Sequence, residues 1–114
     1  MVSSTGTIEK NETSQGQIYQ YSINVGKQIK VEFELPYSVG SLQNGQKVNI
    51  SISSTKPKST KTLLTLRGEV YQIERIRSTT RYIVFFSGLQ GSITAKRSIP
   101  GIKAKKPVFI SISG

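Results

Sequence analysis

Four residue types are missing from this sequence of 114 residues: cysteine, histidine, tryptophan and aspartate. Without cysteine, the chain forms neither a disulfide framework nor a thiolate zinc site. Without histidine and aspartate, it cannot build the serine–histidine–aspartate or cysteine–histidine groups of nucleophilic catalysis. Its six acidic residues are glutamates scattered along the chain, and scattered glutamates rarely make a metal site. We therefore expect a protein that is not an enzyme on its own and that holds no metal, cofactor or small-molecule ligand.

Long apolar runs are missing as well. No run approaches the roughly 18–20 residues that a membrane-spanning helix needs. The N-terminal segment "MVSSTGTIEK" also lacks the basic and then apolar layout of a signal peptide. These features predict a cytoplasmic protein without a membrane partner. The length predicts a single domain over residues 1–114.

Positive charge, in contrast, is in excess and unevenly distributed. The formal net charge is +10, and residues 58–114 carry eleven Lys+Arg against two Glu, whereas residues 1–57 carry five Lys against four Glu. A basic half of this kind favours contact with a polyanion, which could be RNA, DNA or an acidic protein surface. The alternative is a solubilising surface or a basic rim around a protein contact. The candidate cations are Lys56, Lys58, Lys61, Arg75, Arg77, Lys96, Arg97, Lys103, Lys105 and Lys106.

Apolar and polar residues alternate through most of the chain, with no helical stripe of useful length. Glycine, proline and asparagine turn signals separate the alternating runs. Together the runs predict an all-β domain of about eight strands that closes into a small antiparallel, OB-fold-like barrel. The runs occupy residues 17–25, 28–35, 47–54, 62–74, 81–87, 88–95 and 107–114.

Two of these runs carry more apolar surface than one barrel interior needs. In residues 62–74 the apolar face switches at Val70–Tyr71, and Gly68 is interpreted as a barrel bend rather than a ligand cradle. Residues 81–87 are apolar on both faces, so both faces must be covered. The cover is either a partner protein or the chain's own loops and terminal strand. The residues predicted for a partner interface are Tyr71, Ile73, Tyr82, Val84, Phe86 and Leu89.

A platform for single-stranded nucleic acid is not visible in the sequence. OB-folds that bind single strands stack bases on aromatic residues of their second and third strands. The outward positions of residues 17–25 and 28–35 carry no aromatic residue, and Tyr19 and Tyr21 share the inward face with Ile23. Any nucleic-acid contact is therefore expected to be weak, non-specific and made to phosphates.

The runs "RGEVYQIE" and "RYIVFFSGLQGSITA" resemble the subunit-eight family of archaeal and eukaryotic nuclear RNA polymerases, and the archaeal RpoG members most. The eukaryotic members carry a long acidic insertion where this chain has residues 55–61, and they are acidic where this chain is basic. The residues that match the family's two motifs are Gly68, Val70, Tyr71, Ile73 and Glu74, and then Tyr82, Ile83, Val84, Gly88 and Leu89.

The resemblance implies an eight-stranded antiparallel barrel that docks on the largest polymerase subunit and takes no part in catalysis. It also favours a partner protein as the cover of the surplus apolar residues. The second hypothesis, from the charge and the fold class, is a free-standing or ribosome-associated RNA-binding module.

Overall fold

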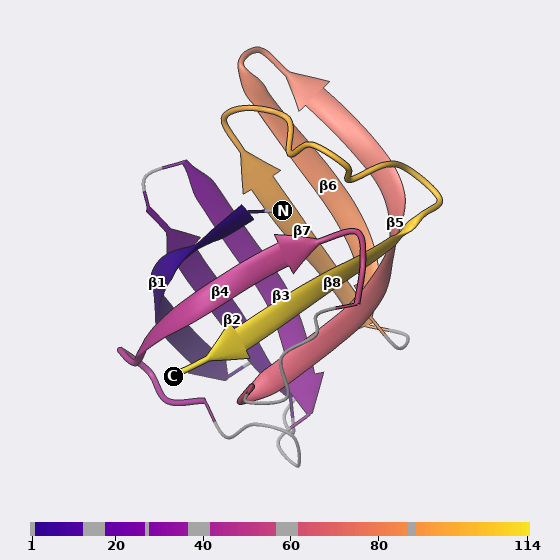
Figure 1. The fold of residues 1–114 in the computed structure, drawn as a ribbon. Helices are drawn as coiled ribbons and strands as arrows, with labels where there is room; N and C mark the ends of the chain where they lie inside the picture. The colour runs from indigo at the N-terminus through magenta and orange to yellow at the C-terminus, as the bar shows by residue number, and fades with distance from the viewer. Residues whose placement is uncertain (1, 13–17, 27, 37–41, 57–61, 87–88) are drawn as a thin grey trace.

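Eight antiparallel strands close into one barrel in the computed structural model, which describes residues 2–12, 18–26, 28–36, 42–56, 62–86 and 89–114 (Figure 1). The order around the barrel is β1-β2-β3-β7-β6-β5-β8-β4, with β4 pairing back onto β1. The described residues contain no helix, and therefore no helix that could cross a membrane. The predicted all-β antiparallel barrel is confirmed. Its strands are β1 Val2–Glu12, β2 Ile18–Val25, β3 Ile29–Pro36, β4 Lys47–Ser53, β5 Leu64–Ile76, β6 Thr79–Phe86, β7 Leu89–Ala95 and β8 Pro107–Ser113.

The predicted inward faces form the core of the barrel. On β2, β3, β4, β5 and β8 the apolar residues of one alternating face are buried, because alternate side chains of a strand point to opposite sides of the sheet. Tyr19, Ile29 and Leu64 lie on the same alternating faces, and they are partly buried and pack against this core. Full burial of an aliphatic or aromatic side chain contributes about 1.5–3 kcal/mol. The buried set includes Tyr21, Ile23, Val25, Val31, Phe33, Leu35, Val48, Ile50, Ile52, Leu66, Val70, Val108, Ile110 and Ile112.

Strand β1 is the one strand that the alternation does not predict. Its sequence is mostly polar, and Ile8 is its buried apolar side chain among those described. Backbone pairing holds it instead: Gly6 to Glu12 pair with β2, and Val2 to Thr7 pair with β4. This strand closes the barrel, so its position is set by the two edges that it joins rather than by its own apolar pattern.

The long strand β5 passes from one neighbour to another near Gly68. Residues 64–69 pair with β8, and residues 69–76 pair with β6. A Cβ at Gly68 would lie 2.7 Å from side-chain atoms of Phe86 and Val84 and 2.8 Å from the Phe85 carbonyl oxygen. Glycine therefore allows β6 to approach β5 closely at the corner where the strand curves (Figure 1). The interpretation of Gly68 as a barrel bend agrees with this geometry.

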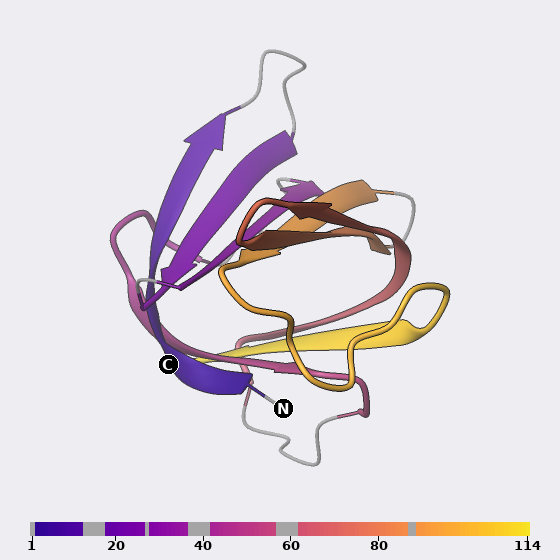
Figure 2. The ribbon, with the colours of Figure 1, turned by 90° about the horizontal axis from the view of Figure 1, so that it is seen from above.

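The loop between β7 and β8, residues 96–106, crosses one end of the barrel (Figure 2). Ile99 and Ile102 from this loop are buried in the core. The backbone N–H of Ile99 donates a hydrogen bond of 2.8 Å to the buried Tyr82 hydroxyl. The loop is therefore part of the packed structure, although its sequence indicates only a basic turn.

Candidate interaction surface

A pair of aromatic side chains stands on the outer face of β5 and β6. Tyr71 is 52% exposed and Phe85 is 41% exposed. Their rings meet edge to face, with centroids 5.3 Å apart and an interplanar angle of 76°. Ile83 lies on the same outer face, because its neighbours Tyr82 and Val84 point into the barrel, but it is 8% exposed. We call Tyr71 and Phe85 the outer aromatic patch.

A β-bulge places Tyr71 on this face. Against β6, Val70 pairs with Val84 and Gln72 pairs with Ile83, so Tyr71 is an extra residue with no opposite partner. The extra residue changes which residues of β5 face outward. The apolar switch that the sequence shows at Val70–Tyr71 is thus the bulge itself.

The segment before β8 fixes the bulge from its other side. The Lys105 N–H donates to the Val70 carbonyl at 2.7 Å, and the Val70 N–H donates to the Lys106 carbonyl at 3.0 Å. Lys105 takes a left-handed backbone conformation with φ of 64°, which costs energy for a residue with a side chain. Its ammonium lies 4.7 Å from the centre of the Tyr71 ring, within the range of a cation–π contact.

An open hollow adjoins Phe85. It is lined by Arg67, Gly68, Glu69, Phe85 and Pro107. Glu69 lies directly opposite Phe85 on the neighbouring strand, so acidic and basic groups border the aromatic side chain. The arrangement is that of an apolar centre with a polar border, which is how protein contact surfaces are built.

The sequence prediction for β6 chose the wrong face. Tyr82, Val84 and Phe86 were expected at a partner interface, but all three are buried, at 1%, 0% and 4% exposure. They point into the barrel, where Phe86 and Val84 fill the space left by the absent side chain of Gly68. Buried core side chains cannot touch a partner, so this part of the prediction is wrong.

Three residues complete the outcome of that prediction. Ile73 pairs with Tyr82 across the sheet and packs, partly buried, against the core, so it too faces inward. Tyr71 is exposed, as a contact residue must be. Leu89 begins β7 opposite Phe86, and its side chain lies outside what the structure describes.

Sequence reasoning missed Phe85 as an exposed residue of β6. Residues 81–87 are apolar on both faces, so the pattern does not say which face is inside. Gly68 on the neighbouring strand decides which face of β6 points into the barrel. Because Gly68 has no side chain, Phe86 and Val84 can pack against it. In the sequence, Gly68 is the signal that could have indicated which face of β6 is buried.

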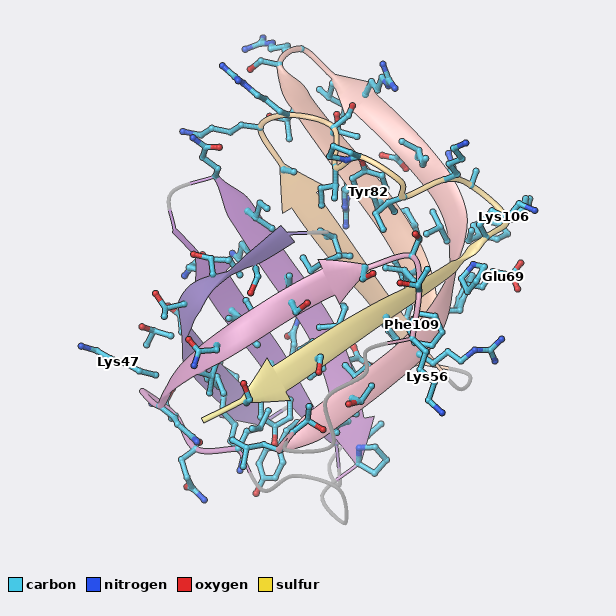
Figure 3. All side chains as sticks on the ribbon, viewed as in Figure 1. Lys47, Lys56, Glu69, Tyr82, Lys106 and Phe109 are labelled. Atoms are coloured by element: carbon cyan, nitrogen blue, oxygen red, sulfur yellow. The ribbon has the colours of Figure 1, made fainter. Side chains whose placement is uncertain are left out.

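The described cations that were proposed for a polyanion contact are all exposed, and they occupy three places. Arg75 and Arg77 lie at the tip of the β5–β6 hairpin, and five more lie on the 96–106 loop. Lys56 follows β4 (Figure 3). Lys58 and Lys61 lie outside the described residues. Among the residues that the structure does describe, none of these cations forms an ion pair with a glutamate. The five loop residues are Lys96, Arg97, Lys103, Lys105 and Lys106.

The faces of β2 and β3 that bind bases in OB-folds carry no aromatic side chain here. Gln20, Asn24 and Lys30 are exposed, and Glu32 lies near Lys30 in an ion pair of 3.9 Å. Tyr21 is buried and stacks on Phe33 with ring centroids 5.4 Å apart. The prediction that Tyr21 belongs to the core is confirmed. Tyr19 is partly buried beside it.

In the described part of the chain, no group of three or more carboxylates gathers into a metal site.

No protein-family model matches the chain, and no curated protein sequence matches it. Among solved structures, the crystal structure of the cytoplasmic molybdate-binding protein ModG, with molybdate bound, aligns with it. The alignment covers 98% of this chain and 89% of that one, at 16% sequence identity and a TM-score of 0.43. A likeness at this level supports no conclusion about a ligand or partner of this protein.

Proposed function

We propose that the protein is a non-catalytic, cytoplasmic subunit of an archaeal DNA-directed RNA polymerase that docks on the largest subunit through the outer aromatic patch. The observation that carries the proposal is the exposed Tyr71–Phe85 pair. Folding does not require it, because both rings stand outside a barrel that is already filled. Exposed aromatic pairs with a polar border are the usual centre of a protein contact.

The motif that resembles the polymerase family adds the identity of the partner. Within "GEVYQIE", Gly68 and Val70 have structural roles at the close approach of β5 and β6. Tyr71 has no such role, since its ring lies outside the core. A partner that covers Tyr71 therefore accounts for the one large apolar residue of the motif that the barrel does not explain.

The residue inventory supports a role without catalysis. The chain lacks histidine, cysteine and aspartate, which supply most general bases and nucleophiles. A scaffolding or assembly role needs a contact surface only. The catalytic centre of the enzyme would lie in other subunits.

A second candidate function is supported by charge. A net charge of +10 and unpaired cations on the 96–106 loop suit a free-standing or ribosome-associated RNA-binding module. The outward faces of β2 and β3 argue against this function, because they carry no aromatic side chain on which such modules stack bases.

Affinity capture from native extract separates the two functions. The tagged protein is recovered under gentle salt, and the bound proteins and RNA are identified by mass spectrometry and sequencing. We expect the large subunits of RNA polymerase at near-equal amounts with the bait. Recovery of ribosomal proteins and rRNA, with no polymerase subunits, would support the RNA-binding module and overturn the polymerase assignment.

A further inference from the structure

One end of the barrel gathers positive charge, and Glu74, which lies opposite Arg81, is the acidic residue next to it. From Arg75 to the C-terminus the chain contains eight Lys+Arg and no Glu. Seven of these cations lie at the β5–β6 hairpin tip and on the loop that crosses the barrel end. Two of the seven, Lys105 and Lys106, directly precede β8, and Lys105 contacts the Tyr71 ring. We call the other five the basic rim: Arg75, Arg77, Lys96, Arg97 and Lys103.

The strand register brings the two parts of the rim together. Arg75 pairs with Thr80, and Thr80 pairs with Ala95, which precedes Lys96. Neighbouring strands are about 4.8 Å apart, so Arg75 and Ala95 are separated by about 10 Å at their backbones. The Lys96 N–H extends the ladder by donating to the Gln28 carbonyl at 3.0 Å. Cations that are about 20 residues apart in sequence thus stand side by side.

The backbone that carries the rim is held by the core. Ile99 and Ile102 are buried, and Tyr82 accepts the Ile99 N–H. The hydroxyls of Thr80 and Ser98 lie 3.4 Å apart, which joins the loop to the start of β6. A charged surface on a fixed backbone loses little backbone freedom when it binds, so the ordering cost is that of its side chains. Such a rim is therefore ready to meet a partner whose charges are also fixed.

We propose that the basic rim binds the sugar–phosphate backbone of a nucleic-acid duplex. A duplex presents a dense and rigid array of phosphates, which suits a cluster of cations that form no ion pair with the described glutamates. The described rim offers no exposed aromatic side chain, and its exposed large apolar residue is Ile76. Single strands bind tightly by base stacking, and protein surfaces dock around apolar centres, so both fit this rim less well. The inference does not depend on the polymerase assignment.

The test measures binding of the purified protein to a fluorescent duplex DNA by anisotropy at several salt concentrations. The logarithm of affinity falls with the logarithm of salt concentration, with a slope of about −0.9 for each phosphate contact. The variant Arg75→Gln with Arg97→Gln removes two rim charges. We expect its slope to be smaller in magnitude by about 2, with an affinity about thirty- to a hundredfold lower at 0.1 M salt.

The matched control is Lys47→Gln with Lys56→Gln, which removes the same net charge. Lys47 lies at the start of β4 and Lys56 follows β4, and both are away from the hairpin tip (Figure 3). We expect this control to keep the slope of the unchanged protein. Circular dichroism melting of each variant confirms that it is folded, and all four positions are exposed.

Four results overturn the proposal. Equal losses in the rim variant and the control would mean that binding follows net charge alone. Tighter binding to a single strand of the same length and salt would point to base contacts. Binding to poly-glutamate without binding to the duplex would identify an acidic protein as the partner. No measurable duplex binding at low salt would leave the rim without this function.

Discussion

At the scale of single residues, Tyr21 combines a ring that packs in the core with a buried hydroxyl that lacks a hydrogen-bond partner among the described residues. The ring is fully buried and stacks on Phe33, with the Tyr19 ring edge-on at 6.2 Å. The hydroxyl has no hydrogen-bond partner among the residues described. Burial raises the pKa of this phenol above its ordinary value of 10.0, and the neighbouring Tyr19 raises it further. The ring thus stabilises the core while the hydroxyl costs desolvation energy.

Tyr21→Phe should stabilise the protein. Removing a buried hydroxyl that lacks a partner is expected to raise the free energy of unfolding by about 1 kcal/mol at pH 7, measured by urea denaturation. Tyr82→Phe is the matched control, because its hydroxyl accepts the Ile99 N–H at 2.8 Å. That variant should lose about 1–3 kcal/mol, since it leaves a buried N–H unsatisfied. Destabilisation of both variants alike would contradict the difference between the two hydroxyls.

The same Tyr21 variant has a second readout at alkaline pH. A folded-state pKa above the unfolded one means that stability is fully present below about pH 10 and is lost as pH rises through the folded pKa. Tyr21→Phe should therefore lose less stability than the unchanged protein when pH is raised above 10. Identical pH dependence of the two proteins would show that Tyr21 does not contribute.

At the scale of the strands, the corner at Gly68 and the bulge at Tyr71 decide which side chains face a partner. Seven of the eight strands follow from alternation in the sequence. The face of β6 does not, because β6 is apolar on both faces and Gly68 of β5 decides which face fits inside the barrel. The burial of Ile99 and Ile102 could not be predicted from the sequence either, because the surrounding lysines and prolines are typical of a solvent-exposed loop. Local patterns show where strands run, but contacts between distant segments decide what they bury.

Gly68→Ala should destabilise the barrel. The new Cβ would lie 2.8 Å from the Phe85 carbonyl oxygen, and this backbone atom can move only if β6 shifts. Overpacking of this kind costs about 1–3 kcal/mol, and we expect a loss in that range by urea denaturation. An unchanged free energy of unfolding would mean that β6 is not held against Gly68 as described.

At the scale of the whole molecule, the barrel separates two surfaces. It measures 32 × 31 × 26 Å, so a partner on one side leaves much of the rest free. The outer aromatic patch lies on the outward face of β5 and β6, whereas Arg75 lies on the opposite face of β5, at the strand's end next to the hairpin tip. The two proposed contacts, at the patch and at the basic rim, therefore use different parts of the molecule.

We propose that the outer aromatic patch anchors the polymerase contact, and capture with matched double variants tests this anchoring role. Capture from native extract is repeated with Tyr71→Ala combined with Phe85→Ala, and with the control Leu63→Ala combined with Ile76→Ala. Leu63 and Ile76 are also exposed apolar residues, at 47% and 59% exposure, but lie outside the patch.

Loss of central aromatic anchors costs about 2–4 kcal/mol of binding, or about thirtyfold or more. We expect the patch variant to melt within a few degrees of the unchanged protein, since both rings are outside the core. We also expect the patch variant no longer to recover the largest polymerase subunit, whereas the control recovers it in full. A folded patch variant that recovers as much of the largest subunit as the control would show that the patch is not the anchor.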